Sequence, residues 1–174
     1  MTTTTDIQLL TPSHWKDYEL IDCGDFEKLE RFGDMILIRP EPQAVWPKSL
    51  SNAEWEKRYH IKFKGRSATS GEWLKKNPKL ADRWHIAYRN DLVEIRFRLG
   101  LTSFKHVGIF PEQAVNWDYI AESVKAIKNP KPKFLNLFAY TGGASLIARA
   151  AGAEVTHVDS IKQVVTWANE NQEL

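Results

Sequence analysis

The sequence FLNLFAYTGGASLIARAAGAEVTHVD spans residues 134–159 and carries the clearest structural pattern of the chain. The run at 134–138 predicts a strand, which leads into a loop with two adjacent glycines, Gly142 and Gly143. A helix is predicted over 144–151 and a second strand over 154–158. Strand, helix and strand in this order are typical of a parallel sheet with a crossover helix. The segment therefore predicts the start of a Rossmann-like α/β domain.

The loop after the first strand is the predicted ligand site. Ligands of open α/β sheets bind at the carboxyl ends of strands, where glycines let a ligand approach the backbone closely. Asp159 follows the second strand, 17 residues after Gly142, close to the spacing of about 20 at which an acidic side chain meets a ribose. An adenosine-type ligand is therefore expected. The alternative is that the glycines only form a tight turn and that Asp159 only caps the next helix.

The glycine pattern narrows the choice of ligand. The loop lacks the G-x-G-x-x-G pattern that holds the pyrophosphate of a dinucleotide, which disfavours an NAD-dependent oxidoreductase. It also lacks the Gly-Lys-Ser or Gly-Lys-Thr of a P-loop. A phosphate-free nucleoside such as S-adenosylmethionine fits this loop better.

Patterns on both sides of this segment complete the expected fold. A helix is predicted over 161–173, and another begins at Pro111 and runs to about residue 127. The first hundred residues hold short β-type runs with turn residues between them, at 18–23, 28–32, 35–39, 59–64, 84–89 and 92–99. We expect an α+β chain with a mainly antiparallel β domain over 1–107, followed by the beginning of a Rossmann-like α/β domain over 108–174.

Charge is unevenly distributed along the chain, although the net charge is only +2. Residues 1–47 carry a net −5, residues 48–108 a net +8 and residues 109–174 a net −1. Lysines and arginines of the middle segment are interleaved with aromatic residues, a mixture that suits a nucleic-acid surface. The alternative is a set of half-buried strands with aromatic side chains inward and Lys or Arg in solvent.

The composition argues against a disordered, a membrane-spanning or a disulfide-rich protein. With 174 residues, 43% of them hydrophobic and 26% charged, the chain should fold as a soluble globular protein. It has no run of about 20 apolar residues and no signal-peptide pattern, so we expect a cytoplasmic protein with no membrane partner. The single cysteine, Cys23, allows no internal disulfide and no cysteine cluster, and no metal site is predicted.

The C-terminal 41 residues resemble the first half of the catalytic domain of class I S-adenosylmethionine-dependent methyltransferases, in the branch that modifies large-subunit ribosomal RNA. The resemblance rests on the N-x-F-x-Y-T-G-G motif at 136–143, on Asp159 and on WANEN at 167–171. It extends to HVGIFPEQAVNWDYI at 106–120 and LERFGDMILIRPEPQAVWP at 29–47. The resemblance implies S-adenosylmethionine as cofactor and RNA, expected to be ribosomal, as methyl acceptor. The cofactor-binding residues that it implies are Phe110, Gln113, Asn136, Phe138, Ala139, Tyr140, Thr141, Gly142, Gly143, Asp159 and Ser160.

For two matched aromatic residues, Phe138 and Trp167, a place in the core is the alternative, and for Asn136 it is a bond to a neighbouring loop. The family's acceptor-holding motif, an Asp or Asn before Pro-Pro, is not present, so no catalytic residue is assigned. We therefore expect a truncated methyltransferase that is inactive alone. The other interpretation is a non-catalytic RNA- or protein-binding module with a vestigial nucleotide loop.

Overall fold

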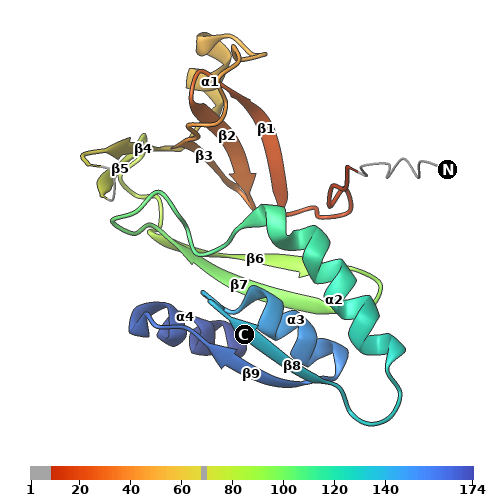
Figure 1. The fold of residues 1–174 in the computed structure, drawn as a ribbon. Coiled ribbons are helices and arrows are strands. Elements are labelled where there is room, and N and C mark those ends of the chain that lie inside the picture. Colours follow the sequence, from red (N-terminus) through yellow and green to blue (C-terminus); the bar gives the residue numbers. More distant parts are fainter. Residues whose placement is uncertain (1–8, 68–69) are drawn as a thin grey trace, which may run out of the picture.

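The computed structural model describes residues 9–67 and 70–174, which form an N-terminal sheet, a central hairpin and a C-terminal α/β unit (Figure 1). The five strands of the N-terminal sheet lie in sequence order, and all neighbours are antiparallel except β3 and β4. They are β1 (Tyr18–Gly24), β2 (Glu27–Phe32), β3 (Met35–Pro40), β4 (Ile61–Gly65) and β5 (Gly71–Lys75). The predicted mainly antiparallel β region is confirmed.

Two elements of this region were not predicted. Helix α1 (Asn52–Arg58) is only 7 residues long, but Ser51 and Glu54 form a capping box at its start, which is the S-x-x-E signal in the sequence. Strand β5 pairs with β4, and most of its side chains are half-buried. Its sequence, GEWLK, shows no clear alternation of apolar and polar residues that would mark a strand. The missed elements are therefore a helix of only 7 residues and a strand without clear alternation.

The central hairpin consists of β6 (Arg83–Arg89) and β7 (Glu94–Gly100) and forms a two-stranded sheet of its own. A side-chain contact covers the free edge of β6 at Ala87. Its carbonyl accepts a 2.7 Å hydrogen bond from the Trp15 indole, and its N–H donates to the Asp17 carboxylate at 2.7 Å. Side chains thus satisfy the backbone groups that a neighbouring strand would otherwise bind.

The C-terminal unit begins with a 3₁₀ turn and continues in the predicted alternation of helices and strands. Its elements are η1 (Pro111–Gln113), α2 (Ala114–Ala126), β8 (Lys133–Leu137), α3 (Gly143–Ala151), β9 (Glu154–Val158) and α4 (Lys162–Gln172). Strands β8 and β9 are parallel and pair in register over their full length. The predicted start of a Rossmann-like domain is confirmed. None of the helices in the described residues is long and apolar enough to span a membrane.

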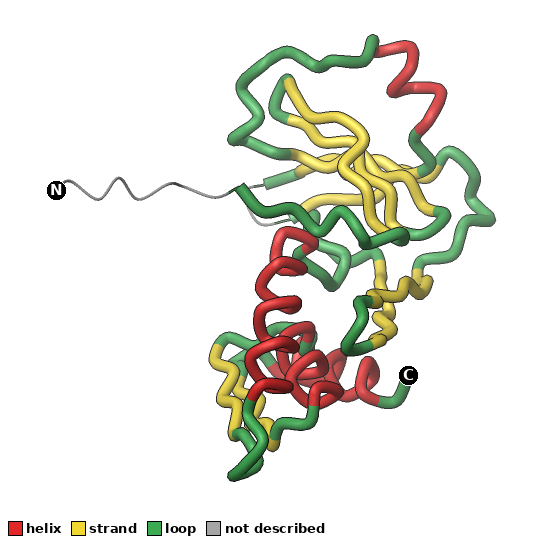
Figure 2. The backbone as a smooth tube through the Cα atoms, turned by 90° about the vertical axis from the view of Figure 1, so that its right-hand side faces the viewer, coloured by secondary structure: helices red, strands yellow, loops and turns green. Residues whose placement is uncertain are grey.

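The hydrophobic core is continuous from the N-terminal sheet to the C-terminal helices. Three aromatic rings from distant segments, Trp15, Tyr88 and Trp117, meet with centroid distances of 5.1–5.6 Å. Figure 2 shows helices α2 to α4 gathered below the N-terminal strands. The division into residues 1–107 and 108–174 stays a prediction. The hairpin belongs to the first of these segments, but its strand β7 contacts α3 and α4 of the second.

A buried carboxylate holds the connection between β3 and β4. Asp22 accepts hydrogen bonds from the backbone of Cys23, Ser49 and Leu50 and from the indole of Trp55, at 2.8–3.2 Å. Burial alone would raise the pKa of Asp22, but these donors outweigh it and lower the pKa below its usual value.

This carboxylate should make stability depend on pH in the acid range. Because its pKa is lower in the folded state, its contribution is present above pH ~4 and is lost as the pH falls through the folded-state value. We expect Asp22→Asn to lower the free energy of unfolding by about 2 kcal/mol at pH 7. Urea unfolding should show a smaller difference between wild type and variant at pH 3 than at pH 7. Asp34→Asn, at an exposed turn, is the control; a constant gap for Asp22→Asn would contradict the assignment.

Candidate functional site

The loop between β8 and α3 has an unusual backbone. Phe138 and Tyr140 both adopt left-handed conformations, with φ of 55° and 53°, which are uncommon for bulky residues. Gly142 precedes α3 with φ 94°, and a Cβ atom there would lie 3.2 Å from the Cβ of Ala168 on α4. Strained backbone of this kind clusters at ligand sites. The glycine pattern in the sequence is therefore explained by backbone geometry and by the close approach of α4.

The second glycine of the loop lets two helices approach closely. A Cβ atom at Gly143 would lie 2.9 Å from the indole ring of Trp117, a buried residue of α2. Helix α3 therefore begins directly against α2, and the loop is fixed from that side. Trp117 was not singled out from the sequence, because one aromatic residue in a helical pattern indicates a core position and no more.

Asp159 joins the carboxyl ends of the two parallel strands. One carboxylate oxygen accepts the backbone N–H of Tyr140 at 2.8 Å, and the other accepts that of Ile161 at 2.9 Å. The N–H groups of Ile161 and Tyr140 lower the pKa of Asp159 below its usual value, so the group is a carboxylate at neutral pH. The hydrogen bond from Ile161 agrees with the alternative that Asp159 caps the next helix. The hydrogen bond from Tyr140 also connects Asp159 to the glycine loop.

Thr141 anchors the loop to two other segments. Its hydroxyl donates to the carbonyl oxygen of Gly108 at 2.5 Å, and its own carbonyl accepts a 2.9 Å hydrogen bond from the amide of Asn171 on α4. Both side chains are buried. The Asn171 amide oxygen in turn accepts the backbone N–H of Arg98 on β7 at 2.8 Å. One buried chain of hydrogen bonds thus connects the hairpin, α4, the glycine loop and the segment before η1.

Aromatic rings line one side of the loop. The rings of Phe110 and Tyr140 lie 4.9 Å apart, and that of His106 lies 5.0 Å from Phe110. Burial raises the pKa of Tyr140 and lowers that of His106, so the tyrosine hydroxyl is protonated at neutral pH and the imidazole tends to be neutral. The apolar ring faces and the neutral groups suit an uncharged ring system.

A crevice of about 360 Å³ lies where these segments meet. Most of the predicted cofactor-binding residues line it together with Ile109, Leu137, Trp117 and Ala144: Phe110, Gln113, Asn136, Phe138, Ala139, Tyr140, Thr141 and Gly143. Gly142, Asp159 and Ser160 do not line the crevice itself. Asp159 borders it through its bond to Tyr140, and Ser160 is exposed beside it.

The structure shows whether Phe138 and Trp167 occupy core positions, which was the alternative for these two residues. A core position for Phe138 is wrong, because its side chain is 92% exposed after the left-handed turn of the backbone. Trp167 is half-buried and donates its indole N–H to the carbonyl of Arg98 at 2.7 Å, so it docks α4 on β7. The cofactor-binding role of the predicted residues stays a prediction.

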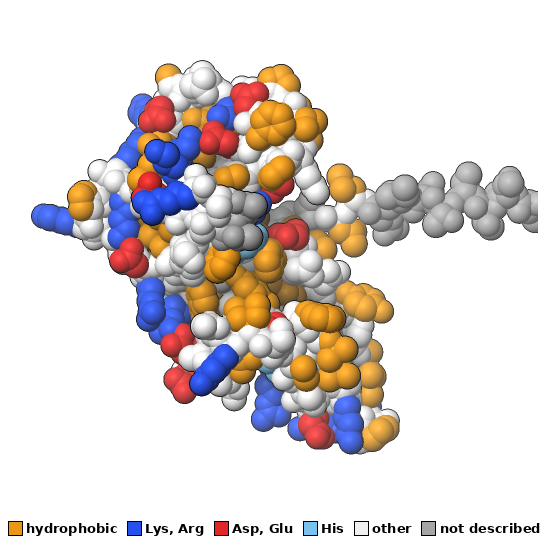
Figure 3. Space-filling model, turned by 60° about the vertical axis from the view of Figure 1, so that its left-hand side comes forward, with side chains coloured by type: hydrophobic (Ala, Val, Ile, Leu, Met, Phe, Trp, Pro, Cys, Tyr) orange, Lys and Arg blue, Asp and Glu red, His pale blue; other side chains and the backbone are white. Residues whose placement is uncertain are grey.

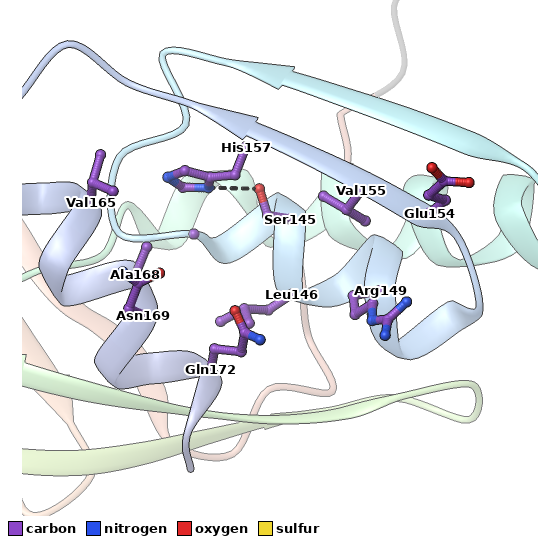
Figure 4. A pocket seen from close by; sticks show the side chains of 11 residues that line it. Ser145, Leu146, Arg149, Glu154, Val155, His157, Val165, Ala168, Asn169 and Gln172 are labelled. Atoms are coloured by element: carbon purple, nitrogen blue, oxygen red, sulfur yellow. Dashed lines mark hydrogen bonds between the residues drawn. The ribbon is translucent and has the colours of Figure 1, made fainter.

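Asn136 takes part in a second, separate arrangement on the other side of α3. Its amide donates to the Ser145 hydroxyl at 2.9 Å, and that hydroxyl lies 3.0 Å from Nδ1 of His157. Figure 4 shows the Ser145–His157 bond at a cavity of about 400 Å³ between α3, β9 and α4. The Asn136 amide group therefore fixes α3 to the sheet.

No group of three or more His, Cys, Asp or Glu side chains that could hold a metal ion occurs within residues 9–67 and 70–174.

The chain is similar in sequence and in structure to known methyltransferases. The chain is 39% identical over 142 residues to a ribosomal RNA large subunit methyltransferase K/L of Shewanella frigidimarina, an alignment that covers 81% of this chain and 17% of that protein. A crystal structure of an S-adenosylmethionine-dependent methyltransferase from Agrobacterium tumefaciens matches with 41% identity and a TM-score of 0.82, covering 91% of this chain and 49% of that one.

A methyltransferase structure from Streptococcus mutans has 17% identity and a TM-score of 0.64, covering 90% of this chain and 42% of that one, and it supports the fold alone. No profile of a known protein family matches the chain. This chain spans only part of the length of each relative. The resemblance to S-adenosylmethionine-dependent methyltransferases, including those of large-subunit ribosomal RNA, is confirmed.

Proposed function

We propose that the chain carries the cofactor-binding start of a methyltransferase that transfers a methyl group from S-adenosylmethionine to a base of RNA. The observation that carries this proposal is the Asp159–Tyr140 hydrogen bond, which places a carboxylate from β9 against the glycine loop after β8. The relatives named as S-adenosylmethionine-dependent methyltransferases support it.

The residues around the crevice fit this cofactor. The ring faces of Phe110 and Tyr140 offer an apolar wall for an adenine, and the Asp159 carboxylate is an acceptor for ribose hydroxyls. The loop has no cationic side chain that would favour a phosphate group, in agreement with a phosphate-free nucleoside. When bound, S-adenosylmethionine supplies a methyl group on a sulfonium centre. This chain's own residues bind and orient the nucleoside, and positioning supplies much of the catalysis in such a transfer.

An RNA acceptor is proposed on two grounds. The K/L relatives are named for ribosomal RNA, and residues 48–108 carry a net +8 charge that would attract phosphates. With a ribosomal RNA acceptor, the proposed location is the cytoplasm. No observation favours the non-catalytic module as a second candidate.

Calorimetry with S-adenosylmethionine tests the cofactor site. The 174-residue chain should bind the cofactor, and Asp159→Ala should weaken binding by roughly 10- to 100-fold, because hydrogen bonds to a charged group contribute about 1.5–3 kcal/mol. The variant also releases the Tyr140 N–H, which acts in the same direction.

Glu154→Ala is the matched control. It removes the same charge as Asp159→Ala, but at the exposed start of β9, the end opposite to Asp159. Its affinity should stay within about twofold of wild type. Equal affinities for wild type and Asp159→Ala would remove the ribose role, and no binding by wild type would contradict the proposed cofactor site.

A further inference from the structure

The β6–β7 hairpin has two chemically different faces. Trp84, Ile86 and Tyr88 of β6 point inward and are buried or half-buried, and Phe97 and Leu99 of β7 join them in the core. The alternate residues of both strands form the outer face. By register, His85 lies opposite Arg98, Ala87 opposite Arg96, Arg83 opposite Gly100 and Arg89 opposite Glu94.

The outer face is strongly basic. Within the described residues, Arg89 pairs with Glu94 and Arg98 with Glu170, whereas Arg83 and Arg96 are exposed and form no ion pair. Both guanidinium groups are therefore accessible to a partner, although Glu94 also interacts electrostatically with Arg96. In Figure 3, Lys and Arg side chains gather along one flank of the molecule, interspersed with Asp and Glu.

A hollow of about 340 Å³ adjoins this face, between the hairpin and α4. Arginines from both strands, Arg83 and Arg98, line it together with the half-buried indole of Trp167. Its polar lining includes Thr102, Gln163, Thr166 and Glu170. The hollow falls at the small end of the usual volume range of ligand pockets, about 300–1,000 Å³. An aromatic ring bordered by hydrogen-bonding side chains is the combination that takes an unpaired nucleobase.

The support beneath the face is fixed. Side chains bind one residue on each free edge of the hairpin: Trp15 and Asp17 bind the backbone of Ala87 on β6, and Trp167 and Asn171 bind that of Arg98 on β7. Arginines on an ordered support lose less conformational entropy on binding than those on a loop. The same Asn171 binds the glycine loop, so the face belongs to the framework that builds the crevice.

We propose that the outer face of the β6–β7 hairpin and the hollow against α4 form a binding surface for single-stranded RNA, with Arg83 and Arg96 on phosphates and the hollow around a base. This inference rests on the proposed RNA acceptor and names the surface that holds it. The exposed arginines favour a polyanion, and the aromatic hollow favours RNA over an acidic protein.

The test measures binding of a fluorescent single-stranded RNA to the 174-residue chain by anisotropy between 50 and 200 mM salt. Arg83→Gln/Arg96→Gln should weaken binding about tenfold and reduce the slope of log affinity against log salt by about 2. Glu170→Gln should strengthen binding severalfold, because it frees Arg98 and removes an anion from the hollow.

Lys125→Gln/Lys133→Gln is the matched control, since it removes the same charge from exposed lysines on α2 and β8. It should change affinity less than twofold. Equal weakening by both pairs of substitutions, or no effect of the arginine pair, would overturn the assignment of this surface. No RNA binding by wild type would also overturn it and would leave an acidic protein as the partner. Cofactor calorimetry, which needs no RNA, tests the proposed function separately.

Discussion

Arg39→Ala should lower the free energy of unfolding by about 3–5 kcal/mol, measured by urea unfolding at pH 7. The Arg39 guanidinium makes two hydrogen bonds to the Glu30 carboxylate, at 2.8 and 2.9 Å, and the two residues are 3% and 0% exposed. Removing the arginine leaves a buried carboxylate with Tyr18 and the more distant Lys28 as partners. It also removes a donor to the Lys105 carbonyl, just before the segment that leads to the crevice.

Two further variants separate the buried pair from a general charge effect. Glu30→Gln/Arg39→Met removes both charges and keeps an acceptor for Tyr18, so it should be clearly more stable than Arg39→Ala. Arg89→Ala breaks the solvent-exposed pair with Glu94 and should change stability little. If Arg39→Ala were no more harmful than Arg89→Ala, the buried pair would not be a stabilising feature.

Gly108→Ala should lower the free energy of unfolding by about 3 kcal/mol and weaken S-adenosylmethionine binding. Gly108 has φ 102°, and a Cβ atom there would lie 2.3 Å from the indole ring of Trp167. The ring cannot withdraw without loss of its 2.7 Å hydrogen bond to Arg98. Because the Gly108 carbonyl holds the Thr141 hydroxyl, the displacement reaches the glycine loop.

Gly152→Ala is the control for backbone strain alone. Gly152 has φ 114°, and no atom lies within 4 Å of the Cβ position. The substitution should cost about 1 kcal/mol in urea unfolding and leave cofactor affinity unchanged. Equal destabilisation by the two substitutions would show that the contact with Trp167 contributes nothing.

Local patterns in the sequence were sufficient for most of the fold. The period of two in residues 92–99 arises from burial of one face of β7. The structure confirms this strand and the strand-helix-strand pattern of residues 134–158 with shifts of one or two residues. Helix α1 was missed because 7 residues contain too few turns to show a helical period.

The candidate site was only partly predictable for a physical reason. Parallel strands end at the same edge of a sheet, so the proximity of Asp159 to the glycine loop followed from the pattern alone. The hydrogen bonds that Thr141 makes with Asn171 and Gly108 join residues that are 30 and 33 positions apart, and no local sequence pattern encodes them. The WANEN motif belongs to the family resemblance, and two of its side chains, Trp167 and Asn171, dock α4 onto the hairpin.

The side-chain caps on the hairpin edges have a consequence for the order of folding. A hairpin closes within microseconds because its strands are neighbours in sequence, but two strands alone are marginally stable in water. Its stabilising partners are remote: Trp15 and Trp167 lie 72 and 69 residues from the backbone groups that they bind. The hairpin therefore gains these edge contacts only after residues 15–17 and 167–171 have docked, which links its stability to the folding of two segments that are far apart in the sequence.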